Sequence, residues 1–211
     1  MHKKLMLACM AIAAFAAFVV APAASATPVL TENGVAVSNG ASIKGTNTGN
    51  TLFTIQGFKE PVECTHAEFK GTLTANTGTT IAGEIPQSTG ANYTFSGTGA
   101  GGDCTSPIGD IKPTLISALC LHAAKGSDNV TINGCGSNPV TFRLDSTTGL
   151  TCNYSVSFLT GTYSTTGDAT INLSEQEAVL EKNESFLCPG AGKLDMDFDL
   201  YTTDGTTLAI S

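Results

Sequence analysis

Tryptophan is absent from this sequence, and charged residues make up only 13% of its 211 positions. The lack of tryptophan, with only four tyrosines, disfavours a sugar-binding surface, because such surfaces usually rely on exposed aromatic rings. Ten basic residues against 18 acidic ones give a net charge of −8, which disfavours nucleic acid as a partner because its phosphates must be neutralised. The chain is still 41% hydrophobic, so its composition is that of a folded protein.

Local motifs of catalysis are missing as well. The sequence contains no Gly-x-Ser-x-Gly, no His-Glu-x-x-His and no phosphate-binding loop. Outside the N-terminal leader only His66 and His122 remain, whereas a metal site usually needs three or four ligands. Because a catalytic triad needs no local motif, an enzyme is disfavoured rather than excluded. We therefore expect no enzymatic activity, no cofactor and no dedicated metal site.

The N-terminus has the pattern of a secretory signal peptide. A basic start is followed by the apolar run Leu5 to Val20 and by Ala24-Ser25-Ala26, the small-residue pattern that signal peptidase cleaves. Residues 1–26 are therefore the predicted signal peptide; lipidation at Cys9 and an uncleaved anchor are the less expected alternatives. No later apolar stretch approaches the roughly 20 residues of a spanning helix. We expect a secreted protein with no membrane attachment after cleavage.

The remaining residues favour β-strands. Threonine and scattered Val, Ile, Phe and Tyr suit strands, and Tyr154, Val156 and Phe158 alternate with polar residues, as in a half-buried strand. Three dipeptides are typical of tight turns: Asn33-Gly34, Asn39-Gly40 and Asp204-Gly205. At most one short helix is expected, around Ser117 to Ala124, where the apolar spacing precedes a glycine. The predicted fold class is all-β.

Two halves of the chain resemble each other. Phe53, Cys64, Gly71 and Cys104 recur in the same order as a second set, namely Phe142, Cys152, Gly161 and Cys188. This order predicts a duplication, with repeat one at about 51–118, a connector at about 119–139 and repeat two at about 140–211. The alternative is that Thr/Gly-rich strand sequences look alike by chance. We expect residues 27–211 to form one β-sandwich domain built from two degenerate repeats.

The six cysteines that follow the leader are predicted to form three disulfides, because an exported chain folds in an oxidising compartment. Six cysteines allow 15 pairings. The repeat favours one bond within each copy, Cys64–Cys104 and Cys152–Cys188, which leaves Cys120–Cys135 in the connector. Each bond would add about 3 to 4 kcal/mol by the chain-entropy estimate. The expected fold is therefore stapled by disulfides.

Three aspartates form the sharpest polar pattern. Asp195, Asp197 and Asp199 alternate with apolar residues, so a strand would place three carboxylates on one face. Calcium prefers clustered oxygen ligands, which makes these residues a weak calcium candidate. An EF-hand is excluded, because it requires glycine where Leu200 stands. The alternative, which we favour, is a solvated face that discourages pairing between sheet edges.

The pattern "VEC…F.GT…DC", followed by "NGC", "CNYS…LTGTY" and "LCPG", resembles uncharacterised secreted bacterial proteins rich in Thr, Gly and paired cysteines. It is more distantly similar to the alkane-oxidation protein activator family of small exported proteins. That resemblance implies a place at the cell exterior or in the extracellular matrix, and it implies no catalytic residues.

We therefore expect a non-catalytic structural or adhesive protein of the cell exterior or extracellular matrix. A secreted module that binds a ligand or a glycan is the alternative, and an enzyme of unknown activity is third. The β-prone segment Thr27 to Lys44 carries few guarding Lys or Pro residues, so its strand edges could pair with other chains. The predicted partners are copies of this chain or components of the cell surface or matrix, and not nucleic acid.

Overall fold

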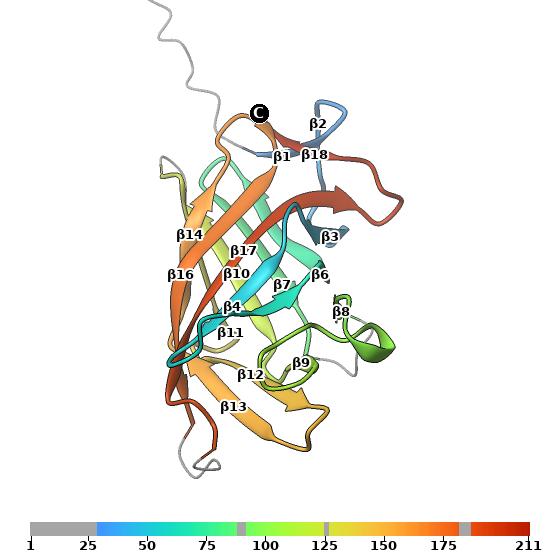
Figure 1. Ribbon diagram of the computed structural model, residues 1–211. Coiled ribbons are helices and arrows are strands. Elements are labelled where there is room, and N and C mark those ends of the chain that lie inside the picture. Colours follow the sequence, from blue (N-terminus) through green and yellow to red (C-terminus); the bar gives the residue numbers. More distant parts are fainter. Residues whose placement is uncertain (1–28, 88–91, 125–126, 182–186) are drawn as a thin grey trace, which may run out of the picture.

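The computed structural model describes residues 29–87, 92–124, 127–181 and 187–211 (Figure 1). The predicted signal peptide, 1–26, lies outside the described residues. The strands are β1 (Leu30–Glu32), β2 (Val35–Ala36), β3 (Ser42–Asn47), β4 (Thr51–Ile55), β5 (Val62–Cys64), β6 (His66–Thr77), β7 (Thr80–Ile85), β8 (Tyr93–Ser96), β9 (Ile111–Leu115), β10 (Leu119–Ala124), β11 (Asn129–Gly134), β12 (Val140–Ser146), β13 (Thr151–Val156), β14 (Leu159–Tyr163), β15 (Gly167–Asp168), β16 (Thr170–Leu180), β17 (Ala191–Thr202) and β18 (Leu208–Ile210). The predicted all-β class is confirmed.

Eight antiparallel strands close into a barrel. Their order is β17-β3-β6-β7-β10-β11-β14-β16, and β16 pairs again with β17 to complete the ring. Each of the two long strands β16 and β17 contributes only one half to this barrel, and both continue beyond it (Figure 1). A closed ring leaves no unpaired edge among these strands.

The other halves of β16 and β17 belong to a second lobe, made with β4, β5, β9, β12 and β13 (Figure 1). In this lobe β4 pairs with β17, and β13 pairs with β16. Two isolated bridges, Glu63 with Thr105 and Cys104 with Ile111, connect β5 to β9 and close the lobe. The barrel and the lobe therefore share one strand pair, and their interiors lie end to end.

A four-stranded sheet in the order β15-β18-β1-β2 covers the far end of the barrel (Figure 1). Its inner strand β1 is fixed to the barrel by Asn76 of β6, whose side chain bonds both the N–H (2.8 Å) and the C=O (2.7 Å) of Leu30. The sequence predicts that strand edges of the segment Thr27 to Lys44 are open to pairing with other chains. Where it is described, its first strand lies between two partners and its last part begins β3, so only β2 is an edge.

The turn signals form turns in the structure. Asn33 and Gly34 both have positive φ, 51° and 79°, and join β1 to β2 as a two-residue hairpin loop requires. The short helix that the sequence allowed around Ser117 to Ala124 is wrong. This segment contains β10, which pairs with β7 on one side and with β11 on the other. Its alternating Leu119, Leu121 and Ala123 face the barrel interior, and tertiary pairing outweighs the helical spacing.

Three disulfides join Cys64 to Cys104, Cys120 to Cys135 and Cys152 to Cys188, which are the predicted pairs. The predicted repeats do not form separate sheets, because β17 of the second repeat pairs with β4 of the first and with β3, which precedes it. The predicted connector at 119–139 contains the barrel strands β10 and β11. The duplication itself stays a prediction. Among the described residues no helix is long and apolar enough to cross a membrane.

Candidate functional site

The barrel interior is lined by the alternate residues of its strands. Ile81 of β7, Leu121 of β10 and Ile171 of β16 point inward, as the period of two along a strand requires. Phe198 and Leu200 of β17 line the same interior, and Phe198 is the cross-strand partner of Ile171. This inner face is the main apolar surface of the barrel.

Three glycines lie on neighbouring strands at positions that face the interior. Gly45 of β3, Gly71 of β6 and Gly83 of β7 all occupy inward positions, and their registers place Gly71 opposite Ile43 and Gly83 opposite Leu73. A methyl group on Gly83 would have its nearest atoms at 3.4 and 3.8 Å, and one on Gly45 at 3.5 Å or more, which are ordinary van der Waals distances. Space is therefore left open beside Gly45 and Gly83, whereas a Cβ on Gly71 would lie 2.5 Å from the backbone oxygen of Glu84.

The space is a cavity of about 100 Å³ inside the barrel. Of the residues that line it, Glu84 alone carries a polar side chain, and that residue is exposed on the outer phase of β7. Protein interiors are normally packed with few voids larger than a water molecule. An apolar cavity of roughly 150 Å³ lined by Leu, Ile and Phe is dry and binds benzene. This cavity is smaller, but its apolar lining has the same chemistry and suits a small apolar molecule.

The cavity has a different neighbour at each end. At the capped end Leu30 of β1, which is fully buried, lines both this cavity and a smaller one of about 20 Å³. At the lobe end a second cavity of about 70 Å³ begins, and the two share four lining residues, Phe69, Leu119, Leu159 and Met196. Among the described residues that line the second cavity, Thr51 of β4 alone carries a polar side chain. Apolar space therefore extends along the molecule from the cap into the lobe.

The predicted calcium candidates share one face of β17, as expected, because the residues between them, Met196 and Phe198, are buried. They are engaged separately. Asp195 Oδ1 accepts the N–H of Glu175 at 2.6 Å, and Asp197 accepts a hydrogen bond from the side-chain amide of Asn172. Burial, and then the charge of Asp168, raises the pKa of Asp199. Calcium binding by these carboxylates stays the less favoured of the two interpretations.

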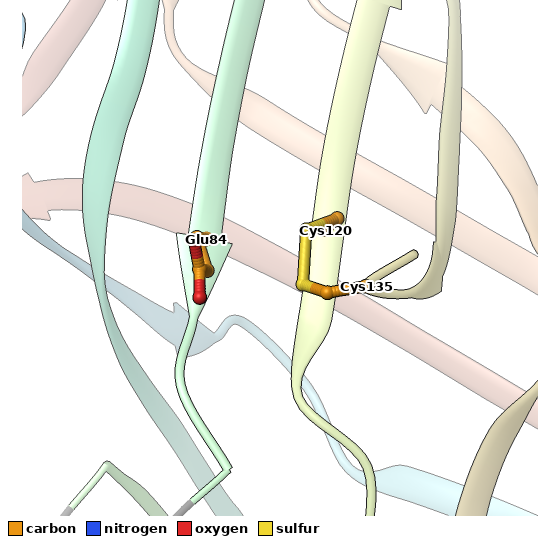
Figure 2. A group of neighbouring side chains, drawn as sticks. All are labelled: Glu84, Cys120 and Cys135. Atoms are coloured by element: carbon orange, nitrogen blue, oxygen red, sulfur yellow. A yellow bond between two sulfur atoms is a disulfide. The ribbon is translucent and has the colours of Figure 1, made fainter. Parts of the chain in front are cut away.

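One other group of potential ligands lies close together among the described residues: Glu84, Cys120 and Cys135 (Figure 2). Glu84 is paired directly opposite Cys120 on neighbouring strands. The two sulfurs are bonded to each other, so they are not thiolate ligands. Both cysteines of this bond are partly exposed, whereas the other four are buried. His66 and His122 lie on β6 and β10, with β7 between these strands.

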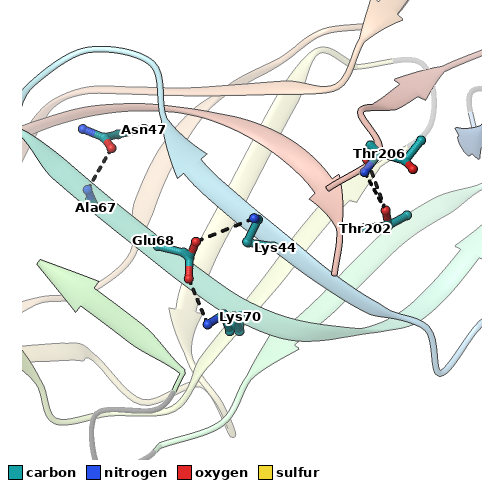
Figure 3. Close-up of polar contacts among 7 residues, drawn as sticks. All are labelled: Lys44, Asn47, Ala67, Glu68, Lys70, Thr202 and Thr206. Carbon is teal, nitrogen blue, oxygen red and sulfur yellow. Dashed lines mark hydrogen bonds and ion pairs between the residues drawn. The ribbon is translucent and has the colours of Figure 1, made fainter. Parts of the chain in front are cut away.

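The outer wall of the barrel carries a compact ion cluster (Figure 3). Glu68 accepts Lys70 Nζ at 2.9 Å and lies 3.7 Å from Lys44 Nζ, while Lys44 also lies over the ring of Tyr201. The hydrogen bond from Lys70 is the largest cause that lowers the pKa of Glu68. Nearby, Asn47 Oδ1 accepts the N–H of Ala67 at 2.8 Å (Figure 3). These charges satisfy one another and hold β3 against β6.

No family model, no curated protein and no solved structure matches this chain. The resemblance that the sequence suggests therefore stays a prediction, and function has to be argued from the cavity.

Sequence reasoning missed the cavity. The glycines were visible, but Gly45, Gly71 and Gly83 lie in separate segments, and only the strand registers bring them to one side of the barrel. The sequence pattern relates Gly71 to Gly161 of the second repeat, and it does not show that Gly71 faces the interior. The usable signal is glycine in the apolar phase of consecutive strands, as in Ile43-x-Gly45, Phe69-x-Gly71 and Ile81-x-Gly83.

Proposed function

We propose that this protein is an exported binding module whose barrel holds a small apolar ligand. The observation that carries the proposal is the cavity of about 100 Å³ with its apolar lining. Among the alternatives weighed from the sequence, the cavity favours the ligand-binding module. The structural or adhesive role, with self-association or matrix partners, stays a prediction.

Two further features support this proposal. The barrel wall is held by continuous strand pairing, so the cavity belongs to a rigid scaffold that need not collapse around it. The three disulfides are typical of extracellular proteins, in agreement with the predicted signal peptide and secretion. A ligand would gain its affinity from burial of apolar surface, about 25 cal/mol for each Å².

Calorimetric titration of the oxidised protein with butylbenzene tests the proposal. We expect saturable binding and a higher unfolding temperature in the presence of the ligand, because a ligand that binds only the folded state stabilises it. Gly83→Val and Gly45→Val place branched side chains in the cavity and should each weaken binding at least about tenfold, since the ligand and the new methyl groups compete for one space.

The matched control is Gly49→Val, because Gly49 is exposed and a Cβ there would meet no atom within 4 Å. This variant should bind butylbenzene as the unmodified protein does. Absence of binding by the unmodified protein would refute the proposal. Equal binding by the two cavity variants and the control would place the ligand elsewhere and would refute it as well.

A further inference from the structure

We propose that the ligand carries one hydrogen-bonding oxygen, a hydroxyl or carbonyl on an otherwise apolar and elongated body, and that Thr51 binds this oxygen. The inference rests on the proposed function and specifies its ligand class. It is carried by the side chain of Thr51 and by the way in which the two larger cavities share their walls.

Thr51 is the first residue of β4 and is 4% exposed. It lies in the same inward phase as Phe53 and Ile55, and it lines the second cavity. Its Oγ1 has no hydrogen-bond partner among the residues that the structure describes. Burial of a hydroxyl without a hydrogen bond is unfavourable, and buried polar groups in proteins are nearly always paired. The hydroxyl thus has unused hydrogen-bonding capacity inside an apolar cavity.

A water molecule is a poor partner for this hydroxyl. Buried waters usually make two to four hydrogen bonds, and in the part of the chain that the structure describes Thr51 alone lines the second cavity with a polar side chain. An oxygen atom that belongs to a largely apolar ligand avoids this problem, because the rest of the ligand fills the apolar space. The cavity chemistry therefore fits a molecule with a single polar atom.

The arrangement of the cavities indicates an elongated ligand. The first and second cavities share Phe69, Leu119, Leu159 and Met196, which form the boundary between barrel and lobe. A ligand whose oxygen meets Thr51 would pass these residues and place its apolar body in the barrel, beside Gly45 and Gly83. The boundary residues are all apolar, so passage of a hydrocarbon chain between them leaves no polar group unpaired.

The test compares phenylbutanol with butylbenzene, which differ by one hydroxyl group, on the oxidised protein and on Thr51→Val. Valine has nearly the same shape as threonine and lacks the hydroxyl. We expect the ratio of the two affinities, phenylbutanol over butylbenzene, to fall about tenfold in Thr51→Val, since a hydrogen bond in a buried site has an effect of this size. Thr51→Ser, which keeps a hydroxyl, should retain the ratio of the unmodified protein.

Thr54→Val is the matched control, because Thr54 lies on the same strand and is exposed. It should leave the ratio unchanged. An unchanged ratio in Thr51→Val, with butylbenzene still bound, would overturn the role of Thr51 and would leave the proposed function intact. Failure of both compounds to bind the unmodified protein would instead overturn the proposed function, and with it this inference. Thermal unfolding of each variant verifies that it is folded.

Discussion

The barrel and the second lobe share the strands β16 and β17, yet they are closed in different ways. The barrel is closed by strand pairing around the whole ring, from β17 through β3 to β16. The lobe is closed by two isolated bridges, where Glu63 exchanges hydrogen bonds with Thr105 and Cys104 with Ile111. The buried disulfide Cys64–Cys104 lies at that closure, and Cys152–Cys188 also belongs to the lobe.

Their interiors differ as well. In the lobe three aromatic rings, Phe53, Phe142 and Tyr154, lie in mutual contact with centroids 5.1 to 5.6 Å apart, and the first two also line the second cavity of about 70 Å³. In the barrel, glycines occupy inward positions and line a cavity of about 100 Å³. In the lobe, covalent bonds and packed rings thus add to the fold where strand pairing ends, between β5 and β9, whereas the barrel is paired around its whole ring.

The largest effect is expected from removal of a lobe disulfide. Replacement of Cys64 and Cys104 by alanine should lower the free energy of unfolding by about 4 kcal/mol, because the bond closes a long loop. Amide hydrogen exchange should rise first at β5 and β9, which lose the covalent closure. Urea unfolding and hydrogen exchange measure the two quantities.

The comparison is the barrel disulfide, Cys120–Cys135, whose separation is 15 residues. Its replacement should cost at most about 3 kcal/mol, since β10 and β11 are already paired along their length. Exchange in the barrel should stay slow. If this pair of substitutions destabilised the protein more than removal of Cys64–Cys104, the proposed difference in closure would be wrong.

A tyrosine in each region sharpens the comparison further. Tyr154 of the lobe is 1% exposed and donates its hydroxyl to Pro189 O at 2.9 Å, so Tyr154→Phe should cost about 1 to 2 kcal/mol. Tyr163 of the barrel donates to Ala124 O at 3.4 Å, a longer and weaker bond, and Tyr163→Phe should cost less. Thermal or urea unfolding of the two variants decides, and a larger loss at Tyr163 would contradict the prediction.

The sequence predicted what depends on local pattern or on covalent chemistry. Alternation at Tyr154 and Val156 identified a strand, although Phe158, predicted to share its buried face, lies beyond the end of β13 and is 56% exposed. Asn33-Gly34 identified a turn, and the cysteine order identified the disulfides. It failed at Leu119 to Ala124, where apolar spacing compatible with a helix lies between two strands that pair with it. Strand order is set by pairings between distant residues, which no local period records.

The candidate site depended on those distant pairings. Gly45 and Gly83 are separated by β6 in the sheet, and the side of the barrel on which they meet follows from register alone. Nothing in the sequence distinguishes Thr51 from the other threonines. Its burial follows from closure of the lobe around β4, which depends on distant pairings. The aspartates of β17 were placed correctly on one face, since that statement needs only the strand period.

Alanine at a glycine should act in opposite directions in the two regions. Gly83→Ala adds a methyl group that meets only ordinary contacts in the cavity, and it should raise the free energy of unfolding by about 0.5 to 1 kcal/mol. Gly192→Ala, in the part of β17 that belongs to the lobe, would overlap the ring of Phe53 and should destabilise. Urea unfolding of both variants is the measurement. A loss of stability in Gly83→Ala would show that Gly83 is enclosed as tightly as Gly192.

The smallest effect is expected at Asp199, where the barrel wall meets the cap. Burial, followed by the charge of Asp168, raises the pKa of Asp199 above its usual range, although a hydrogen bond from Tyr201 opposes this. A carboxyl whose pKa is higher in the folded state stabilises the fold fully below its unfolded pKa, and this contribution is lost as the pH rises through the folded pKa.

Asp199→Asn removes that loss and should therefore stabilise the protein at neutral pH by roughly a few tenths of a kcal/mol, because solvent screens this partly exposed group. The gain should vanish in acid, below the unfolded pKa.

Glu68→Gln, on the same wall, should change the stability in the opposite direction. The pKa of Glu68 is lowered by its hydrogen bond to Lys70, so its contribution to stability is present at neutral pH and is lost as the pH falls through the folded pKa. Urea unfolding of both variants across the acidic to neutral range separates the two. Parallel pH profiles would mean that the contacts of Asp199 with the cap do not control its titration, and that cap and barrel are electrostatically independent.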